Sequence, residues 1–152
     1  MKKIKFFAVA LLAVASVLAV SCSSSNPNAP DPNSDLVVAA AIATSSTLGG
    51  GIAVVGLTSY SGGGYVTGAT VKINGTSLTT YSSGGVTMYV ESGYPSTVMS
   101  GLGVGTTVNL SIVSSKGNAN ASGVVPAAGA AAQTHAVNGA RTGSLMSLQA
   151  ID

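Results

Sequence analysis

The chain has 152 residues, of which 46% are hydrophobic and 7% are charged, and its formal net charge is +2. Three of the six basic residues lie within the first five positions, so the remainder of the chain is close to neutral. Electrostatic binding to nucleic acid requires clustered Lys and Arg, and no such cluster follows Lys5, which argues against a nucleic-acid partner. The single cysteine excludes an intramolecular disulfide, so apolar burial has to stabilise the fold.

The first 21 residues have the layout of a secretory signal peptide. Lys2, Lys3 and Lys5 form a positive start, and the apolar segment from Phe6 to Val20 follows them. This segment is shorter than the roughly 20 residues that a membrane-spanning helix requires. Removal of the segment is therefore favoured over a permanent transmembrane helix.

Residues 18–22, with the sequence Leu-Ala-Val-Ser-Cys, resemble the lipobox of bacterial lipoproteins. The resemblance implies cleavage before Cys22 and acylation of its thiol, palmitate included, so that two or three acyl chains hold the protein on a membrane. Ser23 follows the cysteine, and the absence of aspartate there implies transfer to the outer membrane of a Gram-negative host. Ala19 stands where the family prefers leucine, which leaves open cleavage nearby by a general signal peptidase without lipidation.

Residues 22–35 are interpreted as the lipidated cysteine and a tether rich in Ser, Pro and Asn. Within this segment Asp31, Asn33 and Asp35 match the opening of a calcium-binding loop. The glycine and the glutamate that such a loop requires later are missing, so the sequence favours an acidic linker, and no metal site is expected.

From Leu36 onward, short runs of β-branched residues alternate with Gly-rich stretches, which predicts an all-β fold, a single antiparallel sandwich over residues 36–126. Alternating apolar residues place the clearest strands at Ala69–Asn74 and Thr106–Ser114. The turn signal Asn74-Gly75 predicts a hairpin over Ala69–Thr80. Further strands are expected at Leu36–Thr44, which is alanine-rich enough to form a helical turn instead, at Ile52–Tyr60 and at Val86–Glu91. Residues 127–152 are interpreted as an Ala/Gly-rich tail or, from Gly143 to Ile151, as a last strand.

The segments Gly68–Thr76 and Gly105–Ile112 resemble two strands of the immunoglobulin-like or prealbumin-like sandwich domains found in bacterial surface proteins. The resemblance implies a β-sandwich module, and such modules serve as spacers, adhesins and binding platforms. The buried Trp and the cysteine pair of antibody-type domains are absent from the sequence, which excludes that branch.

The sequence offers little material for catalysis. His135 is the only histidine, and neither a nucleophile elbow nor a Ser-Lys motif is present. Glu91 is the only carboxylate within the sequence of the predicted sandwich, residues 36–126, so paired-carboxylate chemistry is not expected. The sequence therefore favours a non-enzymatic protein without a cofactor, and a hydrolase with His135 as its base is the less favoured alternative.

Tyrosines in Gly/Ser-rich segments are typical of recognition surfaces, because the ring supplies contact area at low entropic cost. Tyr60, Tyr65 and Tyr94 are therefore the candidate ligand contacts, although the sequence favours the plainer explanation that Tyr81 and Tyr89 pack at the sandwich edge and the other tyrosines cover loops. The leading hypothesis is a lipid-anchored envelope module with a structural or binding role. The alternative is a module that binds a glycan or a protein through these tyrosines.

The scarcity of charge on the strands also suggests that the sheet edges of two molecules pair with each other.

Overall fold

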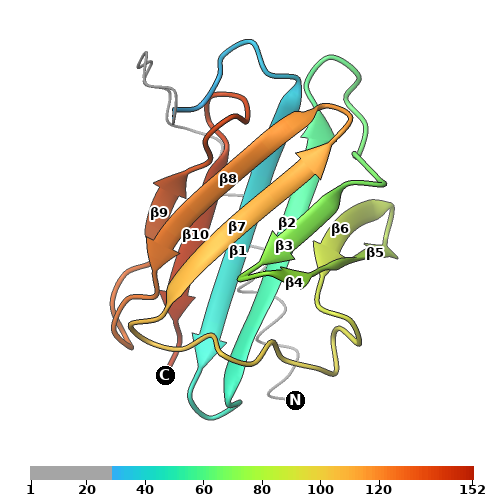
Figure 1. Ribbon diagram of the computed structural model, residues 1–152. Coiled ribbons are helices and arrows are strands. Elements are labelled where there is room, and N and C mark those ends of the chain that lie inside the picture. The colour runs from blue at the N-terminus through green and yellow to red at the C-terminus, as the bar shows by residue number, and fades with distance from the viewer. Residues whose placement is uncertain (1–28) are drawn as a thin grey trace.

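The computed structural model describes residues 29–152, which form two facing β-sheets (Figure 1). The predicted signal peptide and Cys22 lie outside the described residues. The strands are β1 Leu36–Ser45, β2 Gly50–Ser59, β3 Thr70–Ile73, β4 Thr76–Ser77, β5 Thr79–Ser83, β6 Val86–Val90, β7 Thr107–Ser114, β8 Gly117–Val124, β9 Gln133–Ala136 and β10 Leu145–Ala150. The structure confirms the all-β prediction, and β1 is a strand along its whole length, without a helical turn.

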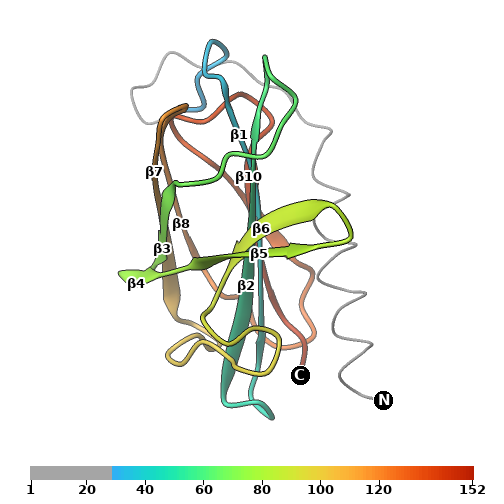
Figure 2. The same cartoon turned by 90° about the vertical axis from the view of Figure 1, so that its right-hand side faces the viewer.

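One sheet has six strands in the order β5-β6-β2-β1-β10-β9, and the other has four in the order β4-β3-β7-β8. Seen edge-on, the four-stranded sheet lies as a separate layer against β1, β2 and β10 (Figure 2). All strand pairs are antiparallel except β1 and β10, which are parallel, with Ala39 opposite Leu145 and Thr44 opposite Ala150. The architecture is a β-sandwich in which antiparallel pairing dominates.

The core lies between the two sheets and follows the alternation predicted from the sequence. In β3, Val71 and Ile73 are buried while Thr70 and Lys72 are exposed. In β7 the inward and outward positions alternate in the same way, and the buried set is Val108, Leu110 and Ile112. Each such side chain contributes roughly 1.5–3 kcal/mol when it is fully buried. The apolar rows of the two sheets therefore hold the sandwich together.

The predicted hairpin turn is present at Asn74-Gly75, where both residues have positive φ, 48° and 82°. This is the geometry of a two-residue turn that matches the twist of its flanking strands. The short strand β4 that follows pairs with β3, with Lys72 opposite Ser77. After the buried Leu78 the chain enters β5 and so changes from the four-stranded to the six-stranded sheet.

Strand β6 has two apolar sides. Tyr89 belongs to the main core, and its hydroxyl donates to the carbonyl of Val66 at 2.9 Å. Met88 and Val90, which the sequence predicted to share a side, face the opposite way and form a small cluster with Val54. We call this group the outer cluster. The partly buried side chains of Ile52, Tyr81 and Tyr94 pack against it.

For residues 127–152 the sequence left a tail or a last strand as alternatives, and the structure has two strands there, β9 and β10. β9 and β10 pair with each other, and β10 adds to β1, so the sandwich continues to Ala150. Met146, Leu148 and Ala150 of β10 are buried in the main core. Within residues 29–152 the structure contains no helix long and apolar enough to cross a bilayer.

Candidate functional site

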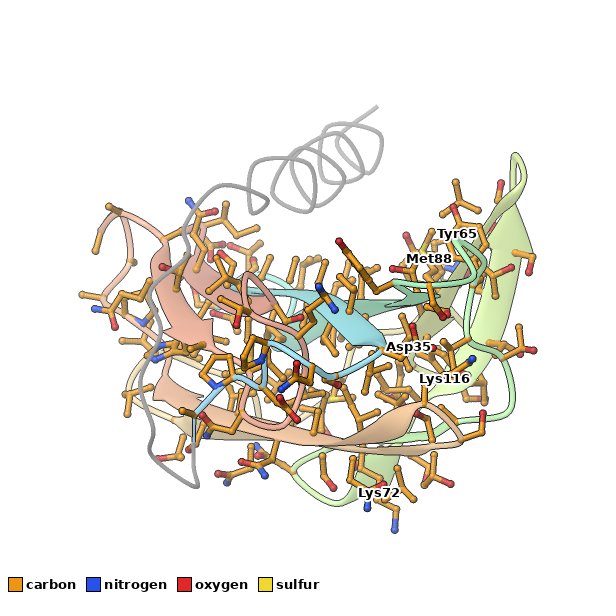
Figure 3. All side chains as sticks on the ribbon, turned by 90° about the horizontal axis from the view of Figure 1, so that it is seen from above. Asp35, Tyr65, Lys72, Met88 and Lys116 are labelled. Carbon is orange, nitrogen blue, oxygen red and sulfur yellow. The ribbon has the colours of Figure 1, made fainter. Side chains whose placement is uncertain are left out.

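A group of polar interactions surrounds Asp35, the residue before β1. Its carboxylate accepts hydrogen bonds from the Ser61 amide at 2.7 Å and the Ser59 hydroxyl at 2.9 Å. It also forms an ion pair with the Lys116 ammonium at 3.0 Å (Figure 3). The Ser61 amide and then Lys116 hold the pKa of Asp35 well below its ordinary value. One carboxylate thereby joins the start of β1, the end of β2 and the β7–β8 turn.

Arg141 lies beside this group and stacks on Tyr60. Its guanidinium carbon is 3.2 Å from the centre of the Tyr60 ring, which is a cation–π contact. The Arg141 side chain donates to the Ser34 carbonyl at 3.2 Å, and its amide donates to the Leu36 carbonyl at 2.7 Å. The Tyr60 amide in turn donates to the Asp35 carbonyl at 2.8 Å. Tyr60 is 61% exposed, although Arg141 lies over its ring.

Of the three tyrosines singled out in the sequence, two share a loop and one does not. Tyr65 is 43% exposed, and it forms an isolated bridge with Thr58 in the same segment that carries Tyr60. Tyr94 instead packs edge-to-face on Tyr81 in the outer cluster, with the ring centres 5.1 Å apart. Burial, and to a lesser extent the nearby Tyr81, raises the pKa of the Tyr94 hydroxyl. The structure therefore carries Tyr60 and Tyr65 on one segment, with Arg141 stacked on Tyr60, and it places Tyr94 against the outer cluster.

His135 belongs to β9, and its side chain points toward β8. Its ring fills the space above Gly123, where a Cβ atom would come within 2.4 Å of Nε2. Nε2 is buried and has no hydrogen-bond partner among the described residues. A histidine that acts as a general base must hold the nucleophile through a ring nitrogen. In the structure the His135 ring packs against the β8 backbone at Gly123.

The opposite end of β1 carries a second carboxylate group. Asp152 accepts hydrogen bonds from the Ser45 hydroxyl at 2.7 Å and from the Ser46 and Thr47 amides at 2.8 and 3.2 Å. Hydrogen bonds from Thr47 and Ser45 lower the pKa of Asp152 to about 2. Beside it is a shallow hollow of about 460 Å³. Its lining consists mainly of glycines, serines and threonines of the β1–β2 turn and of the segment 101–106.

No group of three or more His, Cys, Asp or Glu side chains that could hold a metal ion occurs within residues 29–152. In comparisons with known proteins, no family model, no curated protein and no solved structure matches the chain. What the candidate site can bind is therefore inferred from its own residues alone.

Sequence reasoning did not identify the central role of Asp35 or the contact of Arg141. The available signal for Asp35 was its position directly before the first apolar strand, where a carboxylate can accept from loop amides. Nothing local marks Arg141, because its partner Tyr60 is far away in the sequence.

Proposed function

We propose that the protein is a lipid-anchored lipoprotein of the bacterial cell envelope, placed in the outer membrane of a Gram-negative host, and that its sandwich is a non-enzymatic structural or binding module. The lipobox-like residues before Cys22 support the anchor. The observation that supports an anchored arrangement is a pair of backbone hydrogen bonds that attach residues 29–31 to the sandwich. The Gly139 amide donates to the Ala29 carbonyl at 3.2 Å, and the Asp31 amide donates to the Ala140 carbonyl at 2.8 Å.

These bonds fix residues 29–35 against the Asp35 end of the sandwich, so only residues 23–28 separate Cys22 from the folded part. An extended chain spans at most about 3.3–3.6 Å per residue, which gives a reach of roughly 20–25 Å. In a protein lipidated at Cys22, the Asp35 end of the sandwich, which carries Tyr60, would therefore lie within this reach of the membrane, and the hollow beside Asp152 lies at the opposite end of β1.

The test is the intact mass of the protein purified from bacterial membranes, beside a Cys22→Ser variant fractionated in the same way. We expect a mature N-terminus at Cys22 with added acyl mass, and loss of the variant from the membrane fraction or its accumulation with the leader attached. An unacylated product cleaved at another position would make the protein a secreted β-domain and would overturn the anchor.

The second candidate function is recognition of a glycan or a protein through the loop tyrosines. The observation in its favour is that Tyr60 and Tyr65 are both exposed on one loop, with Arg141 stacked on Tyr60. Aromatic rings with a polar hydroxyl are well suited to contacts of this kind. If this end faces the membrane, the ligand belongs to the protein's own envelope rather than to a neighbouring cell.

A glycan array probed with the full chain tests this second function. Binding that disappears in Tyr65→Ala and persists in Val104→Ala, a change at another exposed apolar residue, would support it. Absence of binding across the array, or equal loss in both variants, would count against recognition through the tyrosines.

A further inference from the structure

Strand β5 is one of the four edge strands within residues 29–152, the others being β9, β4 and β8. β5 is the outermost strand of the six-stranded sheet and pairs only with β6 (Figure 1). On the other side of the sandwich, Asn120 and Asn138 bridge the β8 edge to the chain that follows β9. The two other edge strands are shorter than β5, because β4 has two residues and β9 has four. The β5–β6 hairpin also projects sideways beyond the two layers (Figure 2).

The hairpin register identifies which backbone groups of β5 are free. The turn Gly84-Gly85 has positive φ at both residues, so Ser83 and Val86 form the hydrogen-bonded pair next to it. Hydrogen-bonded and non-hydrogen-bonded pairs alternate along an antiparallel ladder. Tyr81 therefore bonds to β6, whereas the N–H and C=O groups of Thr80 and Ser82 point outward.

The side chains of β5 carry none of the features that usually protect an open edge. Natural edges are blocked by lysine, proline or inward-pointing charge. β5 has the sequence Thr-Thr-Tyr-Ser-Ser, and all its residues except Tyr81 are exposed. A strand without charge meets no electrostatic repulsion when it pairs with an identical strand.

We propose that β5 pairs antiparallel with β5 of a second copy of this chain, around a two-fold axis at Tyr81. In this register Thr80 lies opposite Ser82 of the second copy, and Ser82 lies opposite Thr80. Each of these pairs exchanges two backbone hydrogen bonds, and the two Tyr81 residues form the non-hydrogen-bonded pair between them. The outward groups of the two strands match in this register, which makes β5 complementary to itself and joins the two six-stranded sheets into one.

Disulfide trapping tests both the pairing and its register. Thr80→Cys and Ser82→Cys are placed in two differently tagged full-length chains that are expressed together and oxidised under mild conditions. Residues opposite each other in a hydrogen-bonded pair have Cα atoms about 5.5 Å apart, within the range of a disulfide, while identical positions of the two copies are farther apart. We expect the mixture to form severalfold more crosslinked dimer than either variant alone.

Two controls accompany the trapping. Ser82→Cys expressed with Val124→Cys, an exposed residue of β8, measures random collision. The wild-type chain measures any disulfide through Cys22, its one natural cysteine. Equal crosslinking in the mixture, in the single variants and in the Val124 control would overturn the proposal, as would no crosslinking at all.

A charge-exchange experiment checks the result without a covalent bond. The double variant Thr80→Lys/Ser82→Lys and the double variant Thr80→Glu/Ser82→Glu should each sediment as monomers, and their mixture should form a heterodimer. Dimers in either double variant alone, or no association of the mixture, would contradict pairing through β5. The result does not depend on lipidation, so it is independent of the anchor proposed above.

Discussion

The two ends of β1 are held in different ways. At its start Asp35 binds Ser59 and Ser61 and forms an ion pair with Lys116. At and just beyond its end Ser45, Ser46 and Thr47 donate to the Asp152 carboxylate, and no basic side chain takes part in those contacts. The chain has only four acidic residues, and two of them hold the ends of this central strand.

The difference concerns what each carboxylate joins. Asp35 connects the start of β1, the end of β2 and the β7–β8 turn, so it links both sheets. Asp152 connects the β1–β2 turn to the segment after β10, and these belong to one sheet. A surface ion pair is weakened by salt, whereas hydrogen bonds from neutral donors depend on it much less. The two ends should therefore respond differently to salt and to substitution.

The largest effect is expected in the middle of β1, between the two ends. Ile42 is buried in the main core, and Ile42→Ala should lower the free energy of unfolding by about 2–5 kcal/mol. Leu48→Ala, at an exposed residue of the following turn, is the matched control and should change it by less than about 0.5 kcal/mol. Chemical denaturation of both variants measures the two changes in the free energy of unfolding. Equal decreases in the two variants would contradict the larger contribution expected from the buried Ile42.

The second effect is expected at Asp35. Asp35→Asn keeps one acceptor oxygen but removes the charge, so it should lower the melting temperature at low salt and less so at high salt. Asp31→Asn is the control, because the exposed Asp31 carboxylate accepts a hydrogen bond from the nearby Asn33 backbone amide and forms no ion pair within residues 29–152. Thermal unfolding at two salt concentrations decides the point. A loss in Asp35→Asn that is the same at both concentrations would mean that the Lys116 pair contributes nothing.

The third effect concerns the pH dependence of the Asp152 end. The pKa of Asp152 is about 2 in the folded protein, below its ordinary value of 3.8. The charged form therefore stabilises the fold fully above about pH 4, and this stabilisation is lost as the pH falls toward 2. Asp152→Asn should accordingly melt below wild type at pH 6 and approach wild type near pH 2. Parallel melting curves across this range would contradict a role for the charge.

The smallest effect is expected where Arg141 stacks on Tyr60. Exposed cation–π contacts contribute about 0.5–1 kcal/mol, so Arg141→Met should cost about that much. Tyr60→Leu removes the other partner, and a double variant reports the coupling between the two residues. A coupling near zero would mean that Arg141 acts only through its hydrogen bond to Ser34.

The sequence predicted the strands whose inward residues are large. β3 and β7 alternate clearly between apolar and polar side chains, and β1 and β2 are apolar enough to be recognised. β8 escaped prediction because its inward residues are only Ala119 and Ala121, whose burial gives a weak pattern. It is a strand because every residue from Gly117 to Val124 pairs with β7.

The candidate site was less predictable than the fold. Exposed tyrosines can be recognised in a sequence, and Tyr60 and Tyr65 are indeed exposed. Their surroundings depend on contacts between distant segments, such as Arg141 with Tyr60, and no local pattern encodes these. Tyr94 illustrates the same limit, because only the fold places it against Tyr81.

The parallel pairing of β1 with β10 has a consequence for how the chain matures. The first strand to leave the ribosome is central in its sheet, yet one of its two partners is the last strand to be made. The Val38 amide, for example, finds the Ser144 hydroxyl 106 residues later. At a synthesis rate of about 5–20 residues per second this interval lasts roughly 5–20 seconds. The six-stranded sheet cannot be completed during that time, so β1 keeps one edge without its partner strand until β10 has been made.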